Sequence, residues 1–400
     1  MTDTRTNVAV EDARRLIEDH VGHLSVIGID VQDAVGYVVA EDVLAPISLP
    51  SFAQSAMDGF AIGMLPDGNR DVQWKIVGEV KAGDTREVVV GPGEAFRIFT
   101  GAMVPGGTFS IVRQEDATWS DWEMTVHVYP NAGSNIRHVG GQVAKGDVAL
   151  PKGTLLGPAG VGFLTGLGMT RVSVYAKPKI GLVVTGSELV KSGEPLRKGQ
   201  VYETNSVLLH TALTSAGYET TGVRMVEDDL EATCDAIRQT LQEADVVIVS
   251  GGISVGEYDF VQRSLEALNV HPIFYKINQK PGKPMFFGLV QQNLLFALPG
   301  NPAAVLMCYY QYVLPALRKM SGYKDGTPAK RIMSLKQSFR KKDQRAWFLK
   351  AKTNGNQVEI LEKQGSDMLM DFALADAVVY IPAERTEVEA GGEVEVFFLP

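Results

Sequence analysis

Cysteine is scarce in this chain of 400 residues, which contains only Cys234 and Cys308. Each lies in a segment with helical apolar spacing, so we predict two buried thiols and neither a disulfide nor a metal pair. No apolar run approaches the ~20 residues that cross a bilayer. The N-terminus also lacks the basic and apolar stretches of a secretory signal. These absences predict a cytoplasmic protein that does not contact a membrane.

Positive charge is also in short supply. Lys and Arg number 38 against 47 Asp and Glu, which gives a net charge of −9 and argues against a nucleic-acid binder. One stretch departs from this acidic background. Residues 267–300 contain no Asp or Glu, whereas Lys276, Lys280 and Lys283 fall close together there. A local positive patch in an acidic protein predicts a site for a small anion.

The length of the chain and the changes in residue pattern along it predict several domains. Short β-type runs separated by Gly and Pro turns fill the region between Pro46 and Gly141, and the tail is β-rich, with a hairpin signal at Asn354–Gly355. The predicted division is a discontinuous mixed or helical domain (1–45 and 141–177), an inserted small β domain (46–140), an α/β domain (178–326) and a C-terminal β-barrel-like domain (327–400).

Strands and helices alternate in the predicted α/β domain. Continuous apolar runs at 180–186, 220–226, 245–252 and 293–300 predict strands buried on both faces, whereas 204–216 and 230–244 have helical spacing and 301–320 reads as one long helix. This alternation is typical of a doubly wound, mainly parallel sheet.

Three of these strands end in the same kind of loop. In an open α/β sheet, ligands bind beyond the carboxyl ends of the strands, where glycine allows close backbone approach and helix N-termini offer free N–H groups to an anion. No P-loop or dinucleotide-binding fingerprint is present. The loops are Thr185-Gly186-Ser187, Ser250-Gly251-Gly252-Ile253-Ser254 and Pro299-Gly300-Asn301-Pro302.

Carboxylates gather at the same strand ends, and Mg²⁺ prefers one or two carboxylates together with phosphate oxygens and water. Each acid also has a purely structural interpretation. Asp228 could cap the next helix, Glu257 and Asp259 could be first-turn acids, and Asp58 could be a turn residue. The acids at the strand ends are Glu188, Asp228, Asp229, Glu257 and Asp259.

Seven segments resemble the MoeA/gephyrin-E family in sequence, order and spacing, over nearly the whole chain. This resemblance implies an α/β domain of the molybdopterin-binding kind within an elongated homodimer of four-domain subunits, with a cleft shared between subunits. The segments are SAMDGFAI (55–62), RIFTGAMVP (97–105), VVTGSEL (183–189), YETNSVLL (202–209), VVIVSGGISVGEYDF (246–260), KINQKPGKPMFFG (276–288) and ALPGNPAAV (297–305).

The resemblance also implies a reaction. The family takes molybdate and adenylated molybdopterin, supplied by a molybdopterin adenylyltransferase upstream, and releases AMP and molybdenum cofactor with Mg²⁺ present. Such a reaction needs cations, N–H donors and acids in one cleft.

Roles carry over by motif position. Asp58 and Thr100 would lie on the β-domain side of the cleft, and Lys276 and Lys280 would hold phosphate or molybdate. The acids for metal binding and catalysis would be Glu188, Asp228 and Asp259. The pterin phosphate would be bound by Ser250, Gly251, Gly252 and Ser254. The rest of the ligand-binding set would be Thr185, Gly186, Ser187, Lys283, Pro299, Gly300, Asn301 and Pro302.

One segment departs from the family pattern. After Asn135-Ile136-Arg137, better-known members continue with an arginine-rich stretch that ends in Gly-Glu-Asp, whereas this chain has Gly141 and Gln142 in place of the two acids. This loss leaves open a binding or scaffolding protein that keeps the pterin site without chemistry. An enzyme for tungstate, or adenylyl transfer by the pterin domain, are further alternatives.

Overall fold

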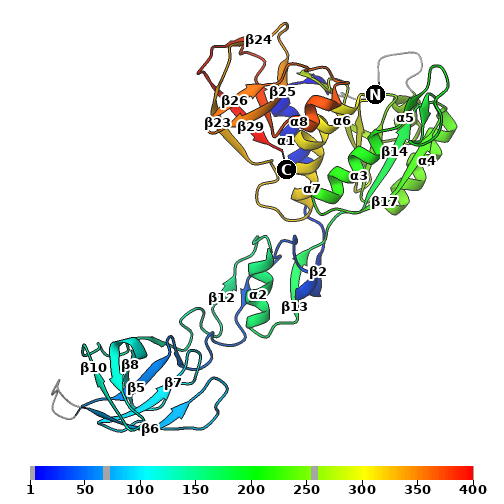
Figure 1. Ribbon diagram of the computed structural model, residues 1–400. Helices are drawn as coiled ribbons and strands as arrows, with labels where there is room; N and C mark the ends of the chain where they lie inside the picture. The colour runs from blue at the N-terminus through cyan, green and yellow to red at the C-terminus, as the bar shows by residue number, and fades with distance from the viewer. Residues whose placement is uncertain (1–4, 66–72, 254–259, 400) are drawn as a thin grey trace. The chain divides into compact units, whose positions relative to one another are not determined.

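The computed structural model describes residues 5–65, 73–253 and 260–399. The chain forms two compact units, which are described separately (Figure 1). The first, called the α/β unit here, comprises residues 1–27, 36–40 and 174–400, and the second, the β unit, comprises 28–35 and 41–173. The strands β2 (Val26–Asp30) and β13 (Arg171–Tyr175) contain points where the chain passes between the units.

A seven-stranded sheet forms the centre of the α/β unit. All its strands run in one direction except β21, which is antiparallel to both of its neighbours, so the prediction of a mainly parallel sheet is confirmed. The strand order is β1 (Arg5–Val8), β19 (His271–Ile277), β21 (Phe286–Val290), β22 (Asn293–Leu298), β18 (Val246–Ser250), β14 (Ile180–Thr185) and β17 (Thr220–Val226).

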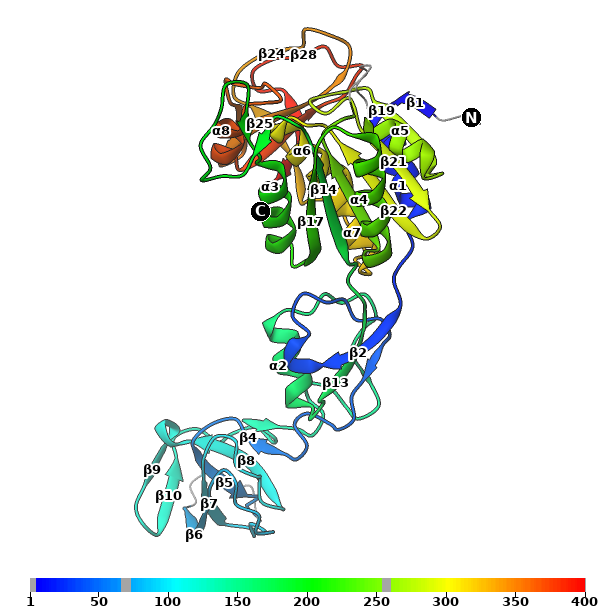
Figure 2. The same ribbon diagram turned by 90° about the vertical axis from the view of Figure 1, so that its right-hand side faces the viewer.

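Helices cover both faces of this sheet (Figure 2). One face packs against α4 (Leu230–Glu243) and α5 (Phe260–Ala267). The other packs against α1 (Val10–His20), α3 (Asn205–Ser215), α6 (Pro302–Cys308) and α7 (Leu314–Met320). Buried residues alternate between the two cores along a strand, since Leu182 belongs to one cluster and Val183 to the other. This alternation explains why the central strands are apolar throughout.

The C-terminal part of the α/β unit is a closed five-stranded barrel. The ring closes because β25 pairs with both β26 and β27, and the two-residue strand β20 (Gln279–Lys280) adds to β25 from outside. The predicted hairpin at Asn354–Gly355 joins β25 to β26, with Gly355 at φ +59°. The barrel strands are β23 (Lys330–Leu335), β25 (Ala346–Asn354), β26 (Gln357–Ile360), β27 (Ala377–Ile381) and β29 (Glu393–Phe398), and α8 (Leu369–Leu374) precedes β27.

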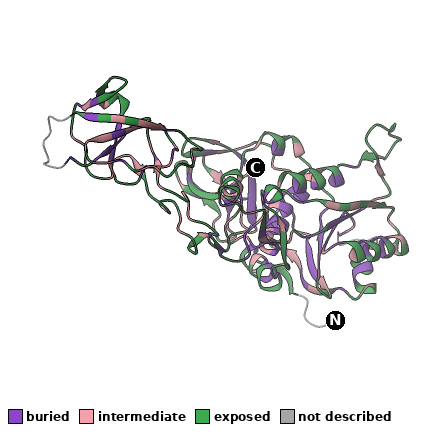
Figure 3. Cartoon of the chain, turned by 90° about the horizontal axis from the view of Figure 1, so that it is seen from below, coloured by how far each residue is buried: buried purple, intermediate pink, exposed green. Residues whose placement is uncertain are grey.

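The β unit contains a six-stranded sheet around its own core, in which Trp74 is fully buried. Figure 3 shows the buried residues gathered on strands and on the inner sides of helices. The strand order is β8 (Thr108–Arg113), β5 (Gly59–Gly63), β7 (Glu94–Ile98), β6 (Trp74–Val80), β10 (Glu123–Val126) and β9 (Ala117–Trp119). The unit also contains α2 (Pro158–Gly166) and the small strand pairs β3 (Val43–Leu44) with β12 (Val148–Leu150) and β4 (Gln54–Ser55) with β11 (Ile136–Arg137).

Two elements differ from the sequence-based expectation. The long closing helix is interrupted by a π-helical turn at Tyr309–Val313. Pro315 follows this turn and cannot donate to the carbonyl of Gln311, so the backbone there widens. The helix α1 was grouped with residues 141–177, but its buried residues Leu16 and Ile17 belong to the main core of the α/β unit.

Both cysteines are free and buried, as predicted, and complete burial raises the pKa of Cys308 to about 12. Among the described residues, no helix is long and apolar enough to span a bilayer.

Candidate functional site

The three glycine loops converge at the carboxyl edge of the sheet, because β14, β18 and β22 are adjacent parallel strands. Gly251 adopts φ +101°, and a Cβ atom there would lie 2.3 Å from the carbonyl oxygen of Thr185. A Cβ on Gly300 would lie 3.7 Å from the Cα of Gly251. The glycines therefore allow the three loops to approach within van der Waals distance.

Asn205, at the start of α3, joins two of these loops. Its amide nitrogen donates to Ser250 Oγ at 2.9 Å and to the carbonyl oxygen of Gly300 at 2.7 Å. Ser250 Oγ in turn donates to the carbonyl of Pro299 at 3.3 Å. The Ser250 hydroxyl is thus buried and used to fix the loops, so only the backbone there remains for a ligand. Asn205 was not predicted as a site residue, although it lies in the motif YETNSVLL. Its position as a polar residue at the start of a helix, shortly after a strand, could have indicated this role.

Two polar side-chain atoms near this edge lack partners among the described residues. Thr185 Oγ1 and Asn205 Oδ1 are both buried without a hydrogen bond. Thr185 Oγ1 faces the two glycines, since a Cβ on Gly251 or Gly252 would lie 2.9 or 3.0 Å from it. A buried polar atom without a partner is costly, and a ligand group that completes its hydrogen bond explains it.

The acid after β17 has a different role from the helix cap considered above. The N-cap of α4 is Asp229, whose side chain accepts from the backbone N–H of Ala232 at 2.8 Å. Asp228 instead pairs with Ser187: its Oδ2 accepts from the Ser187 N–H at 3.3 Å, and its own N–H donates to Ser187 Oγ at 3.0 Å. The capping interpretation of Asp228 is therefore wrong, and this half-buried carboxylate faces the first glycine loop.

Of the other two predicted metal ligands, the structure describes Glu188 but not Asp259. Glu188 is exposed and follows the first glycine loop directly, next to the Ser187–Asp228 pair. Asp259, Glu257 and Ser254 lie outside the described residues. Within the described ranges, no group of three acids, histidines or cysteines gathers closely enough to hold a metal ion. Two acids at neighbouring strand ends still suit Mg²⁺, which takes its remaining ligands from phosphate and water.

Residues 276–285, called the lysine loop here, begin with the last two residues of β19. Since β19 runs in the same direction as β22, this loop lies at the same edge of the sheet. Lys276 is half-buried at φ +66°, with its Nζ 4.5 Å from the ring centre of Tyr275. Lys280 Nζ lies 4.2 Å from the ring centre of Trp347 in the barrel. Neither lysine forms an ion pair with a carboxylate among the described residues. Their positive charges remain available to an anion.

A buried network fixes this loop from behind. The Gln279 side chain donates to the carbonyl of Gly282 at 3.2 Å and accepts from the hydroxyl of Tyr312. Gly282 adopts φ +81°, and a Cβ there would lie 2.5 Å from Cys308 Sγ. The turn is therefore packed against the end of α6 and the π-helical turn, and is not a freely solvated loop.

Ser366, in the C-terminal part of the α/β unit, contacts the last glycine loop. It was not predicted as a site residue. Asn301 Nδ2 donates to Ser366 Oγ at 2.7 Å, and the N–H of Ala304 donates to the Ser366 carbonyl at 3.2 Å. Lys350 is buried and holds this segment by donating to the carbonyls of Gly365 at 3.2 Å and Met368 at 2.9 Å. Burial lowers the pKa of Lys350.

The predicted residues of the β unit also lie together. Asp58 Oδ1 accepts from the Thr100 N–H at 2.7 Å and from the Thr100 hydroxyl at 2.8 Å. These two donors lower the pKa of Asp58. Asp58 is therefore an ionised, oriented and exposed carboxylate.

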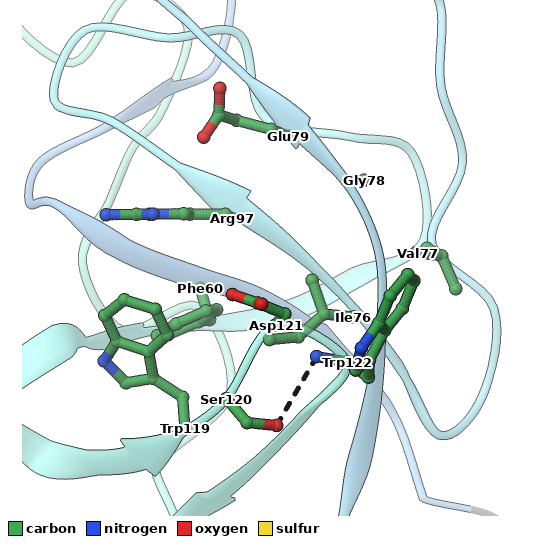
Figure 4. Close-up of a pocket in the computed structure, with 10 residues that line it drawn as sticks. All are labelled: Phe60, Ile76, Val77, Gly78, Glu79, Arg97, Trp119, Ser120, Asp121 and Trp122. Atoms are coloured by element: carbon green, nitrogen blue, oxygen red, sulfur yellow. Dashed lines mark hydrogen bonds between the residues drawn. The ribbon is translucent and has the colours of Figure 1, made fainter.

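An aromatic pocket lies on the same sheet of the β unit (Figure 4). The guanidinium of Arg97 lies 4.8 Å from the ring centre of Trp119, and Glu79 and Asp121 also line the pocket. Ser120 Oγ accepts from the Trp122 N–H at 3.4 Å, which fixes the turn that carries the two tryptophans. Two acids and one guanidinium line this pocket, so its lining has no excess of positive charge.

A doubly wound sheet with glycine loops at one edge, joined to a closed barrel, defines a multidomain α/β protein with a candidate anion site at the carboxyl edge of its sheet. Family models match most of the chain: "MoeA N-terminal region (domain I and II)" over residues 8–168, "Probable molybdopterin binding domain" over 181–319 and "MoeA C-terminal region (domain IV)" over 333–399.

Individual relatives agree with these matches. The chain is 35% identical to the molybdopterin molybdenumtransferase of Haemophilus influenzae, over 92% of each chain, and 28% identical to that of Staphylococcus epidermidis, over 98% of this chain and 96% of the relative. A crystal structure of the molybdopterin biosynthesis MoeA protein from Pyrococcus horikoshii OT3 superimposes with a TM-score of 0.85 at 27% identity, over 98% of this chain and 100% of the other. The chain belongs to the MoeA family, whose curated members here are enzymes named molybdopterin molybdenumtransferase.

Proposed function

We propose that this enzyme inserts molybdenum from molybdate into adenylated molybdopterin, releasing AMP and molybdenum cofactor with Mg²⁺ present, in the cytoplasm. It would act as a homodimer whose cleft is shared between subunits, downstream of a molybdopterin adenylyltransferase. The names of its relatives support the metal and the pterin. We also propose Asp58 and Thr100, which lie together in the β unit, as catalytic residues.

The observation that carries this proposal is the edge of the sheet where cations, acids and glycine loops meet. The backbone of Gly251 and Gly252 and the free Thr185 Oγ1 support binding of a phosphate-bearing pterin. Lys276 and Lys280 have no acidic partner among the described residues and would hold the molybdate or phosphate oxygens. Such fixed charges stabilise an anion without reorganisation when the phosphoanhydride breaks.

Magnesium fits the donor set of this edge. Glu188 and Asp228 would hold it, and Asp259, outside the described residues, is the third ligand we propose. When bound, the ion would neutralise charge on the phosphate oxygens of the leaving AMP. Ser187 orients Asp228 through their reciprocal hydrogen bonds, which fix Oδ2; Oδ1 forms no hydrogen bond among the described residues.

The test is AMP release from adenylated molybdopterin, molybdate and Mg²⁺. We expect turnover by the wild-type protein and loss of at least tenfold in rate on Lys276→Ala. The matched control is Lys319→Ala in α7, since the ammonium group of Lys319 donates only to the carbonyl of Glu18 in α1 among the described residues. Absence of AMP above the Lys276→Ala background would refute the proposal. Replacing molybdate by tungstate in the same assay tests the tungstate alternative.

A pterin-binding scaffold is the second candidate, favoured by Gly141 and Gln142, where the resembled family has acids. It predicts pterin binding that Asp228→Ala does not change, without AMP release at any metal concentration. Adenylyl transfer by the pterin domain alone is less well supported, because family models match the β unit and the barrel as well.

A further inference from the structure

Lys276 adopts a left-handed backbone conformation inside the strand β19, with φ +66°. Residues other than glycine seldom adopt this conformation, and it persists only where the surrounding structure holds it. Its effect is visible in the packing of β19. Side chains of a regular strand point alternately to opposite faces, yet Phe274 and Ile277, three positions apart, both belong to the main core. The strand therefore bends at Lys276.

The bend places the Lys276 side chain beside that of its chain neighbour. Its Nζ lies 4.5 Å from the ring centre of Tyr275, whereas neighbouring side chains of a regular strand leave on opposite faces. The hydroxyl of Tyr275 donates to the carbonyl of Ile253, in the second glycine loop, at 3.3 Å. The left-handed residue thus keeps its ammonium group beside a ring that is anchored to a glycine loop.

The edge strand β1 carries a matching bend. Asn7 adopts φ +56° and lies opposite Lys276, between paired residues on either side. The strand β1 is the outer neighbour of β19 (Figure 2), and the N–H of Asn278 donates to the Val8 carbonyl at 2.8 Å. Because both strands bend at the same level, their pairing continues past Lys276 into the lysine loop.

Asn7 suits this position through its backbone alone. Asparagine tolerates the left-handed region better than other residues that have a side chain. The Asn7 side chain is exposed and forms no hydrogen bond to a described residue. On the other side of the bend, the N–H of Lys276 donates to the Met285 carbonyl at 2.8 Å. The bend is therefore held between the lysine loop and β1.

We propose that Asn7 is a positioning residue for Lys276. Its left-handed backbone keeps β1 paired through the bend and so holds the Lys276 ammonium group where it binds the oxyanion substrate. The inference rests on the proposed function, which assigns Lys276 to the oxyanion, and molybdate binding is measured both with and without turnover. A protein that binds molybdate but releases no AMP would refute the proposed function, and its affinity for molybdate would still test Asn7.

The test compares two exposed asparagines that are both left-handed. Asn269, at φ +54°, precedes the opposite end of β19. A β-branched side chain disfavours this conformation, so Asn7→Val and Asn269→Val carry a similar local cost. We expect Asn7→Val to raise both the Kd and the KM for molybdate roughly fivefold or more, with kcat little changed. Asn269→Val should leave all three constants unchanged. Asn7→Gly, which permits the same backbone, should behave as the wild type.

Hydrogen exchange at the Asn278 amide reports the pairing itself, and melting temperatures report folding. We expect faster exchange at this amide in Asn7→Val and the wild-type rate in Asn7→Gly. Asn7→Ala strains the backbone less and replaces the valine variant if that variant does not fold; its Kd should rise about threefold. Wild-type affinity for molybdate in the folded Asn7 variant, or an equal loss of affinity in Asn7→Gly or Asn269→Val, would overturn the proposal.

Discussion

Single glycines decide how closely the strand-end loops approach one another. Gly251 combines a left-handed backbone with a contact that no side chain could share, because a Cβ there would overlap the Thr185 carbonyl. The buried Thr185 hydroxyl beside it has no partner among the described residues. The geometry of the ligand site therefore depends on backbone atoms and on one orphan hydroxyl, more than on long side chains.

Gly251→Ala should destabilise the α/β unit and abolish AMP release. Alanine at φ +101° costs roughly 1–3 kcal/mol, and its methyl group would push the loop off Thr185. Gly222→Ala in β17 is the control, because a Cβ there meets nothing within 4 Å. Melting temperatures and AMP release would be compared for the two variants. Equal behaviour of the two would contradict the assigned role of Gly251.

Asp58→Asn should show a pH-dependent loss of stability. Thr100 lowers the pKa of Asp58 below its ordinary value of 3.8 in the folded protein. The stabilisation is therefore present above the unfolded pKa and is lost as the pH falls through the lower folded pKa. The melting temperature of the wild type should exceed that of the variant at pH 7, and the difference should disappear in acid. The control is Glu41→Gln, which should show no such trend, because Glu41 is exposed and its side chain has no hydrogen-bond or ion-pair partner in the described ranges.

Residue roles were only partly predictable. The glycine loops and lysines were identifiable from composition because they depart from the local average. For Asp228 the sequence left both a helix cap and a site role open, because Asp228 or Asp229 could start the same helix. The structure gives the cap to Asp229 and pairs Asp228 with Ser187. Ser366 was missed because it comes from the barrel and meets Asn301 across a long stretch of sequence.

At the scale of elements, the lysine loop is held by the segment behind it. The Gln279 amide is buried and satisfied by Tyr312 from the π-helical turn, so the irregular helix and the loop are coupled. The loop also pairs with the barrel through β20. The lysines are thus positioned both by the π-helical turn behind the loop and by the barrel strand β25.

Tyr312→Phe should weaken this coupling. Removing the hydroxyl leaves the buried Gln279 carbonyl oxygen without its donor, which costs roughly 1–3 kcal/mol. We expect a lower melting temperature and a raised KM for molybdate. Tyr310→Phe is the matched control, since its hydroxyl forms no side-chain hydrogen bond among the described residues. A KM equal to that of the wild type would show that the loop does not depend on Gln279.

Regular elements were predictable where apolar periodicity is strong. The strand at 220–226 was placed at its observed bounds, and β14, β18 and α3 were placed within a few residues. The strand β1 was missed because its four residues are largely exposed and carry no alternation; only its pairing with β19 makes it a strand. The π-helical turn follows from Pro315 inside an otherwise continuous helical pattern.

On the scale of the whole molecule, the two units have separate hydrophobic cores. The clusters around Trp74 and around Phe296 share no residue. The division of these two units into four domains remains a prediction. Separate cores imply that each unit can lose stability alone.

Calorimetry should therefore show two transitions. Trp74→Ala, which deletes a buried ring that donates to the Gly63 carbonyl at 3.0 Å, should lower only one of them, by a cost of roughly 3–5 kcal/mol. Phe296→Ala in β22 should lower the other by a similar amount. One cooperative transition that both variants shift equally would contradict independent units.

The pairing of β1 with β19 has a consequence for synthesis on the ribosome. Arg5 lies opposite Phe274, and Val8 lies opposite Ile277, directly beyond Lys276. The first strand and α1 therefore emerge long before their partners exist, whereas every residue of the β unit has been made by position 173. Since domains fold as units during translation, the β unit is expected to fold first. The nascent N-terminus then stays exposed until the lysine loop leaves the exit tunnel.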